Sequence, residues 1–159
     1  IKNGGKYYAS AVGEVNVVEM MKEKNAVIGG EGNGGVIFPE LHYGRDALVG
    51  IALFLTYLAN KKLKMSDLKS SFPQYTISKN KLALTKSTNI DLLLEKISNK
   101  YKNVKQNKID GLKLEFENEW VHMRKSNTEP IIRIYAESQN EKSAHNLGER
   151  FVEELKSLI

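Results

Sequence analysis

The first half of the chain carries apolar residues with mainly helical spacing. Residues 13–24 place apolar side chains on one face and polar ones elsewhere, which predicts a helix. Segments 45–59, rich in Ala, Leu and Ile, and 64–72 predict two more. Short extended stretches at 6–9 and 25–29 flank the first helix. They predict a strand–helix–strand unit with a right-handed crossover, which is typical of an α/β layer.

In the second half, alternating strands and amphipathic helices follow one another. Leu112, Leu114 and Phe116 alternate with charged residues, the pattern of an antiparallel strand with one buried face. The last helix is apolar on one side and charged on the other, so it should cover one face of a sheet. The predicted strands are 75–79, 110–117, 119–124 and 131–138, and the predicted helices are 88–101 and 141–158.

The composition turns polar around residues 71–81, and Pro73 interrupts any helix there. We therefore expect an α/β part over residues 1–70 and an α+β part over 71–159, the second being an antiparallel sheet packed with two helices. Because the chain begins at Ile1 rather than Met, we expect a fragment of a longer protein.

Composition narrows the class of protein. The 159 residues are 41% hydrophobic, enough to bury a core, and include no cysteine, which excludes disulfides and Cys-based zinc sites. No apolar run approaches the length of a membrane span and no signal peptide opens the chain, so we expect no membrane partner and a cytoplasmic location. The net charge of +5 favours anionic ligands, but acidic residues are mixed among the basic ones.

The strongest chemical signal is the stretch from Arg124 to Arg133, which joins two predicted strands. Ser126, Asn127 and Thr128 suit a turn whose backbone N–H groups can form an anion-binding concavity. An arginine on each side can offer a bidentate fork to a phosphate or carboxylate. The segment therefore predicts a binding site for one dianionic group.

A second signal is the glycine-rich stretch 29–35, which contains the spacing of a dinucleotide-binding fingerprint. That interpretation is disfavoured because the following segment is extended and interrupted by Pro39, so no helix N-terminus faces the glycines. Glu31 and Asn33 stand alone among glycines, and a carboxylate beside an amide suits vicinal sugar hydroxyls.

The sequence Arg-x-Ser-Asn-Thr-Glu-Pro-x-x-Arg at 124–133 resembles the phosphate-binding loop in the last domain of the alpha-D-phosphohexomutase family. That family includes phosphoglucomutases, phosphomannomutases and phosphoglucosamine mutases. The resemblance implies that Arg124, Ser126, Asn127, Thr128 and Arg133 bind the phosphate group of a phosphorylated hexose.

The glycine-rich stretch Gly-Glu-Gly-Asn-Gly-Gly resembles the sugar-specificity loop in the third domain of the same family. The resemblance implies sugar contacts from Glu31, Asn33 and Gly35. Many family members have Ser at the position of Asn33 and His at that of Gly35, so this chain lacks any contact that a His would make. The form found here, continuing through 39–46, is most similar to the phosphoglucosamine-mutase branch.

The resemblance runs from about residue 11 to 159 and implies the last part of domain 3 followed by domain 4. The catalytic serine of the family, in a Ser-His-Asn-Pro context, and its Asp-rich Mg²⁺ loop lie in earlier domains, and neither pattern occurs here. The resemblance therefore implies no catalytic residue and no metal ligand in this chain, a Mg²⁺ cofactor bound elsewhere, and missing N-terminal domains of the same polypeptide as partners. Such a chain alone should be inactive.

Two alternatives stay open. The sugar could be that of a phosphomannomutase or phosphoglucomutase of the same family. The second part could instead be an RNA-binding α+β module, since Trp120 and His122 alternate with Arg124 and Tyr135 lies on a neighbouring strand. The absence of a concentrated basic stripe argues against a nucleic-acid partner.

Overall fold

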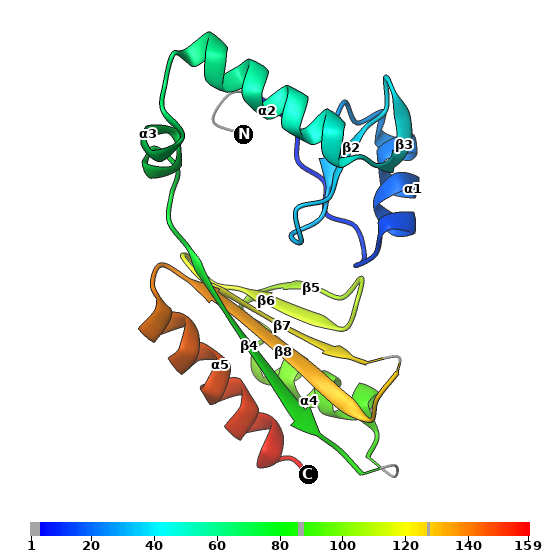
Figure 1. The fold of residues 1–159 in the computed structure, drawn as a ribbon. Coiled ribbons are helices and arrows are strands. Elements are labelled where there is room, and N and C mark those ends of the chain that lie inside the picture. Colours follow the sequence, from blue (N-terminus) through cyan, green and yellow to red (C-terminus); the bar gives the residue numbers. More distant parts are fainter. Residues whose placement is uncertain (1–3, 86–87, 127) are drawn as a thin grey trace. The chain divides into compact units, whose positions relative to one another are not determined.

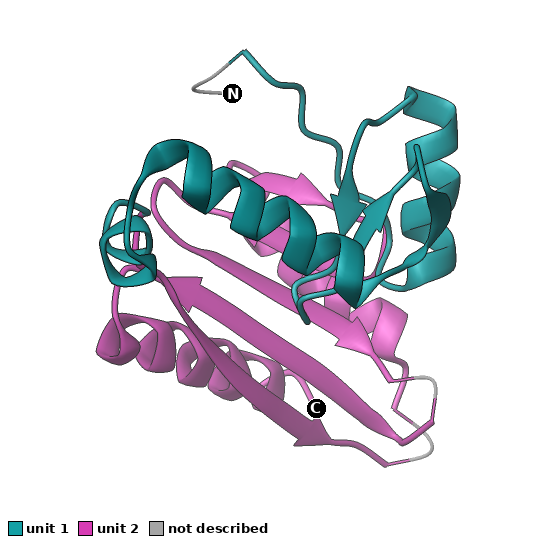
Figure 2. Cartoon of the chain, turned by 45° about the horizontal axis from the view of Figure 1, so that its top comes forward, with its two compact units in different colours: residues 1–72 teal, residues 73–159 magenta. Residues whose placement is uncertain are grey.

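A computed structural model of the chain describes residues 4–85, 88–126 and 128–159. The chain divides into two compact units, residues 1–72 and 73–159 (Figure 2). Each unit has its own sheet, and the larger cluster of buried apolar side chains belongs to the second.

The first unit combines three helices with a small antiparallel sheet in the order β1-β2-β3. Its strands are short because glycines and turns interrupt them. Ile37 is fully buried at the centre of the sheet, and Met21 is buried on the first helix. The elements are α1 (Glu14–Lys24), β1 (Gly29–Gly30), β2 (Val36–Phe38), β3 (His42–Arg45), α2 (Ala47–Lys61) and α3 (Met65–Ser70).

Two strands predicted for this unit are wrong. Residues 6–9 form no strand, and Tyr7 is largely exposed. The segment 25–29 is not a buried strand because Asn25 adopts a left-handed conformation that ends α1, and Val27 is exposed. The predicted strand–helix–strand crossover is therefore replaced, within these residues, by antiparallel pairing of β1, β2 and β3.

Helix α2 is apolar on more than one side, yet none of its residues is buried. Leu48 is 79% exposed and Leu55 is 53% exposed. Asp46 caps the helix, since its Oδ1 accepts a hydrogen bond from the Val49 N–H at 3.0 Å. The helix is thus well formed locally, but several of its large apolar side chains are exposed on the first unit.

The second unit is a two-layer α+β domain, as expected for residues 71–159 (Figure 1). Its antiparallel sheet has the strand order β4-β8-β7-β6-β5. The short strand β5 was not anticipated from the sequence. The elements are β4 (Thr76–Ala83), α4 (Ile90–Lys100), β5 (Lys105–Asn107), β6 (Leu112–Glu115), β7 (Trp120–Lys125), β8 (Ile131–Ser138) and α5 (Glu141–Lys156).

Both helices of the second unit cover the same face of this sheet. The strand register places Met123 opposite Leu112 and Ile134, and all three are buried. Phe151 of α5 and Ile97 of α4 belong to the same buried cluster. The alternate strand positions, Arg124 and Arg133 among them, therefore lie on the face that α4 and α5 do not cover.

Candidate functional site

The hairpin formed by β7 and β8 positions the phosphate-binding candidates. The two strands pair from Trp120 opposite Glu137 to Lys125 opposite Ile132, and Arg124 lies directly opposite Arg133. Directly opposed residues of a strand pair share one face, with Cβ atoms about 5 Å apart. Both guanidinium groups therefore project from the same face, beside the loop that joins the strands.

Neither arginine's guanidinium group makes a hydrogen bond to another described residue. The closest carboxylates are those of Asp110, whose Oδ2 lies 3.7 Å from Arg124 Nη1, and Glu129, whose Oε2 lies 3.8 Å from Arg133 Nη2. Both separations exceed hydrogen-bond distance. The side chain of Arg124 is 25% exposed and that of Arg133 is 35% exposed. Their N–H donors are therefore partly removed from water, and no acceptor of the described residues lies within hydrogen-bond distance of them.

The loop side chains lie next to this pair of arginines. Ser126 is buried, and its Oγ lies 3.4 Å from the Thr128 Oγ1. The Ser126 N–H donates to the Ile131 carbonyl at 3.1 Å, so the expected free backbone donor is wrong at this residue. Asn127 lies outside the described residues. Lys125 shares the sheet face of its partner Ile132, opposite the arginines.

A supporting turn was missed by the sequence reasoning. The segment joining β5 to β6 carries Asp110, and the His122 Nε2 lies 2.5 Å from the carbonyl oxygen of that residue. Gly111 has φ +76°, and a Cβ there would lie 2.3 Å from the Met123 carbonyl oxygen. The Asp-Gly dipeptide is a turn signal that could have revealed this hairpin. The turn places a carboxylate beside Arg124.

The sugar-binding candidates form a hydrogen-bonded turn between β1 and β2. The Gly35 N–H donates to Asn33 Oδ1 at 2.9 Å, and Asn33 Nδ2 lies 3.4 Å from Glu31 Oε2. Gly30 is required sterically, because a Cβ there would lie 2.4 Å from the Gly35 carbonyl oxygen. The structure thus brings Glu31, Asn33 and Gly35 together in one turn, and their contact with a sugar stays a prediction.

Arg45 links this turn to α1 and was also missed. Its Nε donates to Glu14 Oε2 at 2.9 Å, and its Nη1 lies 3.5 Å from Glu31 Oε2. The hydrogen bond from the Arg45 backbone N–H, together with the nearby guanidinium, lowers the pKa of Glu14. No periodic pattern marks this long-range contact, so sequence reasoning had no signal for it. Arg45 holds the Glu31 carboxylate in place.

The described residues contain no cluster of potential metal ligands. Within residues 4–85, 88–126 and 128–159, no three His, Asp or Glu side chains come together in a way that could hold a metal ion. His42 instead contacts the α2 cap, with its Nε2 3.1 Å from Asp46 Oδ2. The residues do not fit a Mg²⁺ site, and no magnesium ligand is assigned here.

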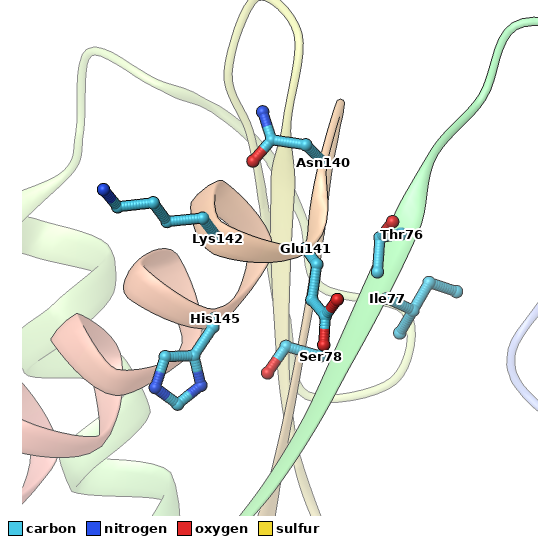
Figure 3. A pocket seen from close by; sticks show the side chains of 7 residues that line it. All are labelled: Thr76, Ile77, Ser78, Asn140, Glu141, Lys142 and His145. Carbon is cyan, nitrogen blue, oxygen red and sulfur yellow. The ribbon is translucent and has the colours of Figure 1, made fainter.

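A hollow in the second unit lies away from the phosphate-binding candidates. Figure 3 shows the Glu141 side chain pointing toward Ser78 on β4, whereas Lys142 points away from that strand. The hollow adjoins the start of β4 and the end of β8, and the 126–130 loop precedes the start of β8. An eight-residue strand spans about 25 Å. This hollow is therefore separate from the site. Its lining residues are Thr76, Ile77, Ser78, Asn140, Glu141, Lys142 and His145.

Comparison with known proteins places the chain in one family. Residues 1–75 match the family described as phosphoglucomutase/phosphomannomutase, alpha/beta/alpha domain III, and residues 84–154 match its C-terminal domain. A phosphoglucosamine/phosphogalactosamine mutase of Sulfurisphaera tokodaii is 37% identical over 93% of this chain and 32% of its own length. A phosphoglucomutase/phosphomannomutase of Thermococcus kodakarensis is 36% identical over 96% of this chain and 34% of its own length.

A solved structure has a similar fold. The phosphoglucomutase/phosphomannomutase family protein of Burkholderia thailandensis aligns with a TM-score of 0.79 and 25% identity, over 98% of this chain and 33% of its own. The chain thus spans about a third of the length of the relatives it matches. Among the described residues, no helix combines the length and apolar character needed to cross a bilayer. The chain belongs to the phosphoglucomutase/phosphomannomutase family, of which it carries sequence of domain III and the C-terminal domain.

Proposed function

We propose that this chain is the sugar- and phosphate-binding part of a phosphosugar mutase that interconverts hexose 1-phosphate and hexose 6-phosphate. The observation that carries the proposal is the pair Arg124 and Arg133, which lie directly opposite each other on one sheet face and whose guanidinium groups make no hydrogen bond to another described residue. Two planar forks beside a hydroxyl-bearing loop match the three oxygens of a phosphoryl group.

The loop binds the phosphate group that is not being transferred. Arg124 and Arg133 supply charge, and Ser126, Asn127 and Thr128 supply hydroxyl and amide groups to its oxygens. Phosphoryl transfer depends mainly on positioning and charge stabilisation, so a firm hold on the spectator phosphate contributes directly to the rate. No general acid or base is assigned to this chain.

The glycine-rich turn contacts the hexose ring. Glu31 accepts hydrogen bonds from sugar hydroxyls, and Asn33 can both donate and accept. Arg45 keeps the Glu31 carboxylate oriented, and Gly35 leaves room for close approach of the ring. A mutase must hold its sugar in two orientations, and hydroxyl contacts of this kind are compatible with both.

Upstream domains of the same polypeptide complete the enzyme. The chemistry that family membership assigns to them is a phosphoserine that donates its phosphoryl group, with Mg²⁺ stabilising the charge. They also cover the apolar sides of α2, of which Leu48 and Ile51 are the most exposed large side chains. Two findings support this: the matched domain III is an alpha/beta/alpha layer, and the relatives are about three times longer.

The proposed substrate is glucosamine phosphate. Its support is the Gly-Glu-Gly-Asn-Gly-Gly form of the sugar loop and the name of the Sulfurisphaera tokodaii relative. Other relatives bear the names phosphoglucomutase/phosphomannomutase and phosphomannomutase, so glucose and mannose phosphates are the alternatives to test.

An RNA-binding role has less support. Stacking of bases needs open aromatic faces. The Lys113 Nζ lies 4.6 Å from the centre of the Trp120 ring, and the Lys79 Nζ lies 5.7 Å from that of Tyr135. Each ring therefore already has a cation against one face.

Calorimetric titration of the 159-residue chain tests the proposal. Glucosamine 6-phosphate should bind saturably, free glucosamine should bind far more weakly, and a single-stranded RNA should bind without a defined stoichiometry. Comparison with mannose 6-phosphate and glucose 6-phosphate ranks the sugars. The chain alone should show no mutase turnover. Equal binding of glucosamine with and without phosphate, or tight stoichiometric RNA binding, would overturn the proposal.

A further inference from the structure

Three cations form a row across the uncovered face of the second sheet. Lys81 on β4 pairs with Arg133 on β8, which in turn pairs with Arg124 on β7. Directly opposed side chains have Cβ atoms about 5 Å apart, and like charges in that position repel. The row therefore opposes sheet formation.

Lys79 shows which face of the sheet Lys81 occupies. Lys79, two residues before Lys81, projects from the same face, and its Nζ lies 5.7 Å from the centre of the ring of its cross-strand partner Tyr135. Leu82, which follows Lys81, is buried on the opposite face with its partner Ile132. Lys81 therefore projects on the side of the two arginines.

Other lysines on this face have partners, whereas Lys81 does not. Lys105 and Lys113 both contact Glu115, and Lys79 lies over Tyr135. Within residues 4–85, 88–126 and 128–159, no carboxylate lies within ion-pair range of the Lys81 Nζ, and no ring lies beneath it. The row of Lys81, Arg133 and Arg124 is thus a local excess of positive charge.

The carboxylates at the ends of the row do not neutralise it closely. Asp110 and Glu129 approach the arginines at 3.7 and 3.8 Å, and each comes from a turn rather than from the sheet face. An anion with two charges placed over the row would relieve the repulsion among all three cations. Inorganic phosphate and phosphate monoesters carry such a charge near pH 7.

Edge-strand protection is the competing explanation for Lys81. β4 is an edge strand, and lysines on edge strands discourage pairing with another chain. Lys79 serves that purpose equally well on the same strand and face. Because Lys79 lies opposite Tyr135 and Lys81 lies opposite Arg133, the two lysines make a matched pair for experiment.

We propose that Lys81 is a third cationic contact to the substrate phosphate and selects dianionic over monoanionic sugar esters. This proposal rests on the proposed function of Arg124 and Arg133. A lysine ammonium is a mobile point charge with three donors, so it can follow a phosphate oxygen that the two planar forks leave open. A third charge adds more to the binding of a dianion than to that of a monoanion.

Calorimetric titration of the whole chain with two probes tests this role. The phosphate group of glucosamine 6-phosphate is dianionic near pH 7, and the sulfate group of glucosamine 6-sulfate is monoanionic and of similar shape. Lys81→Ala should weaken the phosphate probe by about three- to tenfold, as expected for one charge-assisted contact on a partly exposed surface. The affinity for the sulfate probe should fall less in Lys81→Ala, and Lys81→Arg should retain most of the affinity for the phosphate probe. Lys79→Ala should change either affinity by less than about twofold.

The outcomes separate this inference from the proposed function. If Lys81→Ala behaves like Lys79→Ala while Arg133→Ala loses binding, the Lys81 contact is wrong and the phosphate site stands. If Arg133→Ala also leaves binding unchanged, the phosphate site itself is wrong, and the Lys81 contact falls with it. An equal loss of phosphate and sulfate binding in Lys81→Ala would overturn the selection of dianions.

Discussion

Arg124 and Arg133 lie directly opposite each other in the β7–β8 pair, where two positive charges repel. A hairpin under selection for stability alone would favour an opposite charge or an aromatic residue at one of these positions. The arrangement instead gathers positive charge beside a loop that carries the buried Ser126. Repulsion in the sheet and attraction for an anion are therefore two consequences of the same pair.

Replacement of one member of this pair separates stability from binding. Arg124→Gln should lower phosphate affinity by about tenfold or more, because a bidentate charged contact is lost. The free energy of unfolding should stay constant or rise by about 0.2–1 kcal/mol as the repulsion disappears. Urea denaturation and phosphate titration of the same variant measure the two effects. A large loss of stability would mean that Arg124 serves the fold instead.

Gly111 should be the more sensitive of the two glycines in the second unit. Gly111→Ala forces a side chain into a left-handed conformation and against the Met123 carbonyl oxygen, at about 1–3 kcal/mol of destabilisation. Gly148→Ala meets side-chain atoms that can shift, Asn80 Nδ2 at 2.2 Å and Ser78 Oγ at 3.3 Å, and gains helix propensity. Thermal unfolding of both variants makes the comparison. Equal stability of the two variants would contradict the tight approach at the β5–β6 turn.

Glu154 should make the second unit sensitive to acid. It accepts hydrogen bonds from Lys100 at 2.8 Å, Tyr101 at 2.6 Å and Arg150 at 3.2 Å. Burial, the largest single influence, raises the pKa of Glu154, but these hydrogen bonds outweigh it and hold that pKa below its ordinary value of 4.5. A carboxyl with a lower pKa in the folded state stabilises the fold above its unfolded value and ceases to do so as pH falls through its folded value.

The free energy of unfolding should therefore decrease as pH falls below about 4.5, measured by urea denaturation at a series of pH values. Glu154→Gln should flatten this part of the profile. Glu149→Gln, which changes an exposed residue of the same helix, should keep it. Indistinguishable profiles for the two variants would show that the Glu154 hydrogen bonds do not cause the acid sensitivity.

Much of the phosphate hairpin could be predicted from the sequence, since its strands alternate regularly and its loop is a distinctive motif. The supporting residues could not. Asp110 reaches Arg124 across a hairpin, and Arg45 reaches Glu14 across 31 residues of sequence; such contacts leave no periodic trace. The extended segment expected after the glycines forms β2, whereas β1 and β3 were missed because two to four residues that include glycine carry too little pattern.

The sequence shows that α2 is apolar, but it does not show whether the α2 side chains are buried. Burial depends on what packs against a helix, and none of the α2 residues is buried here. The failed strand at 25–29 has a different cause. Asn25, which ends α1, adopts a left-handed conformation and so interrupts the extended segment. Asn adopts this conformation readily, but the surrounding sequence did not indicate it.

The junction between the units should be the first point of proteolytic attack. Residues 70–75 join two compact units that separate between Phe72 and Pro73, and Phe72 and Tyr75 are exposed. Limited chymotrypsin digestion followed by mass spectrometry should release a stable fragment that begins at residue 76, because Pro73 blocks cleavage after Phe72 and Tyr75 is the next exposed aromatic residue. Initial cleavage within the sheet at residues 110–138 would argue against this boundary.

Phosphate titration followed by backbone amide shifts tests the central claim most directly. Inorganic phosphate should shift amide signals of residues 124–133 in the wild-type chain, with weak affinity because a single phosphate on an open surface gains little. Arg133→Ala should abolish the shifts, Arg124→Lys should not preserve them because a point charge cannot replace a planar fork, and Lys125→Ala should leave them intact. Shifts that map away from residues 124–133, or that are lost only in Lys125→Ala, would contradict the assignment of this hairpin as the phosphate-binding site.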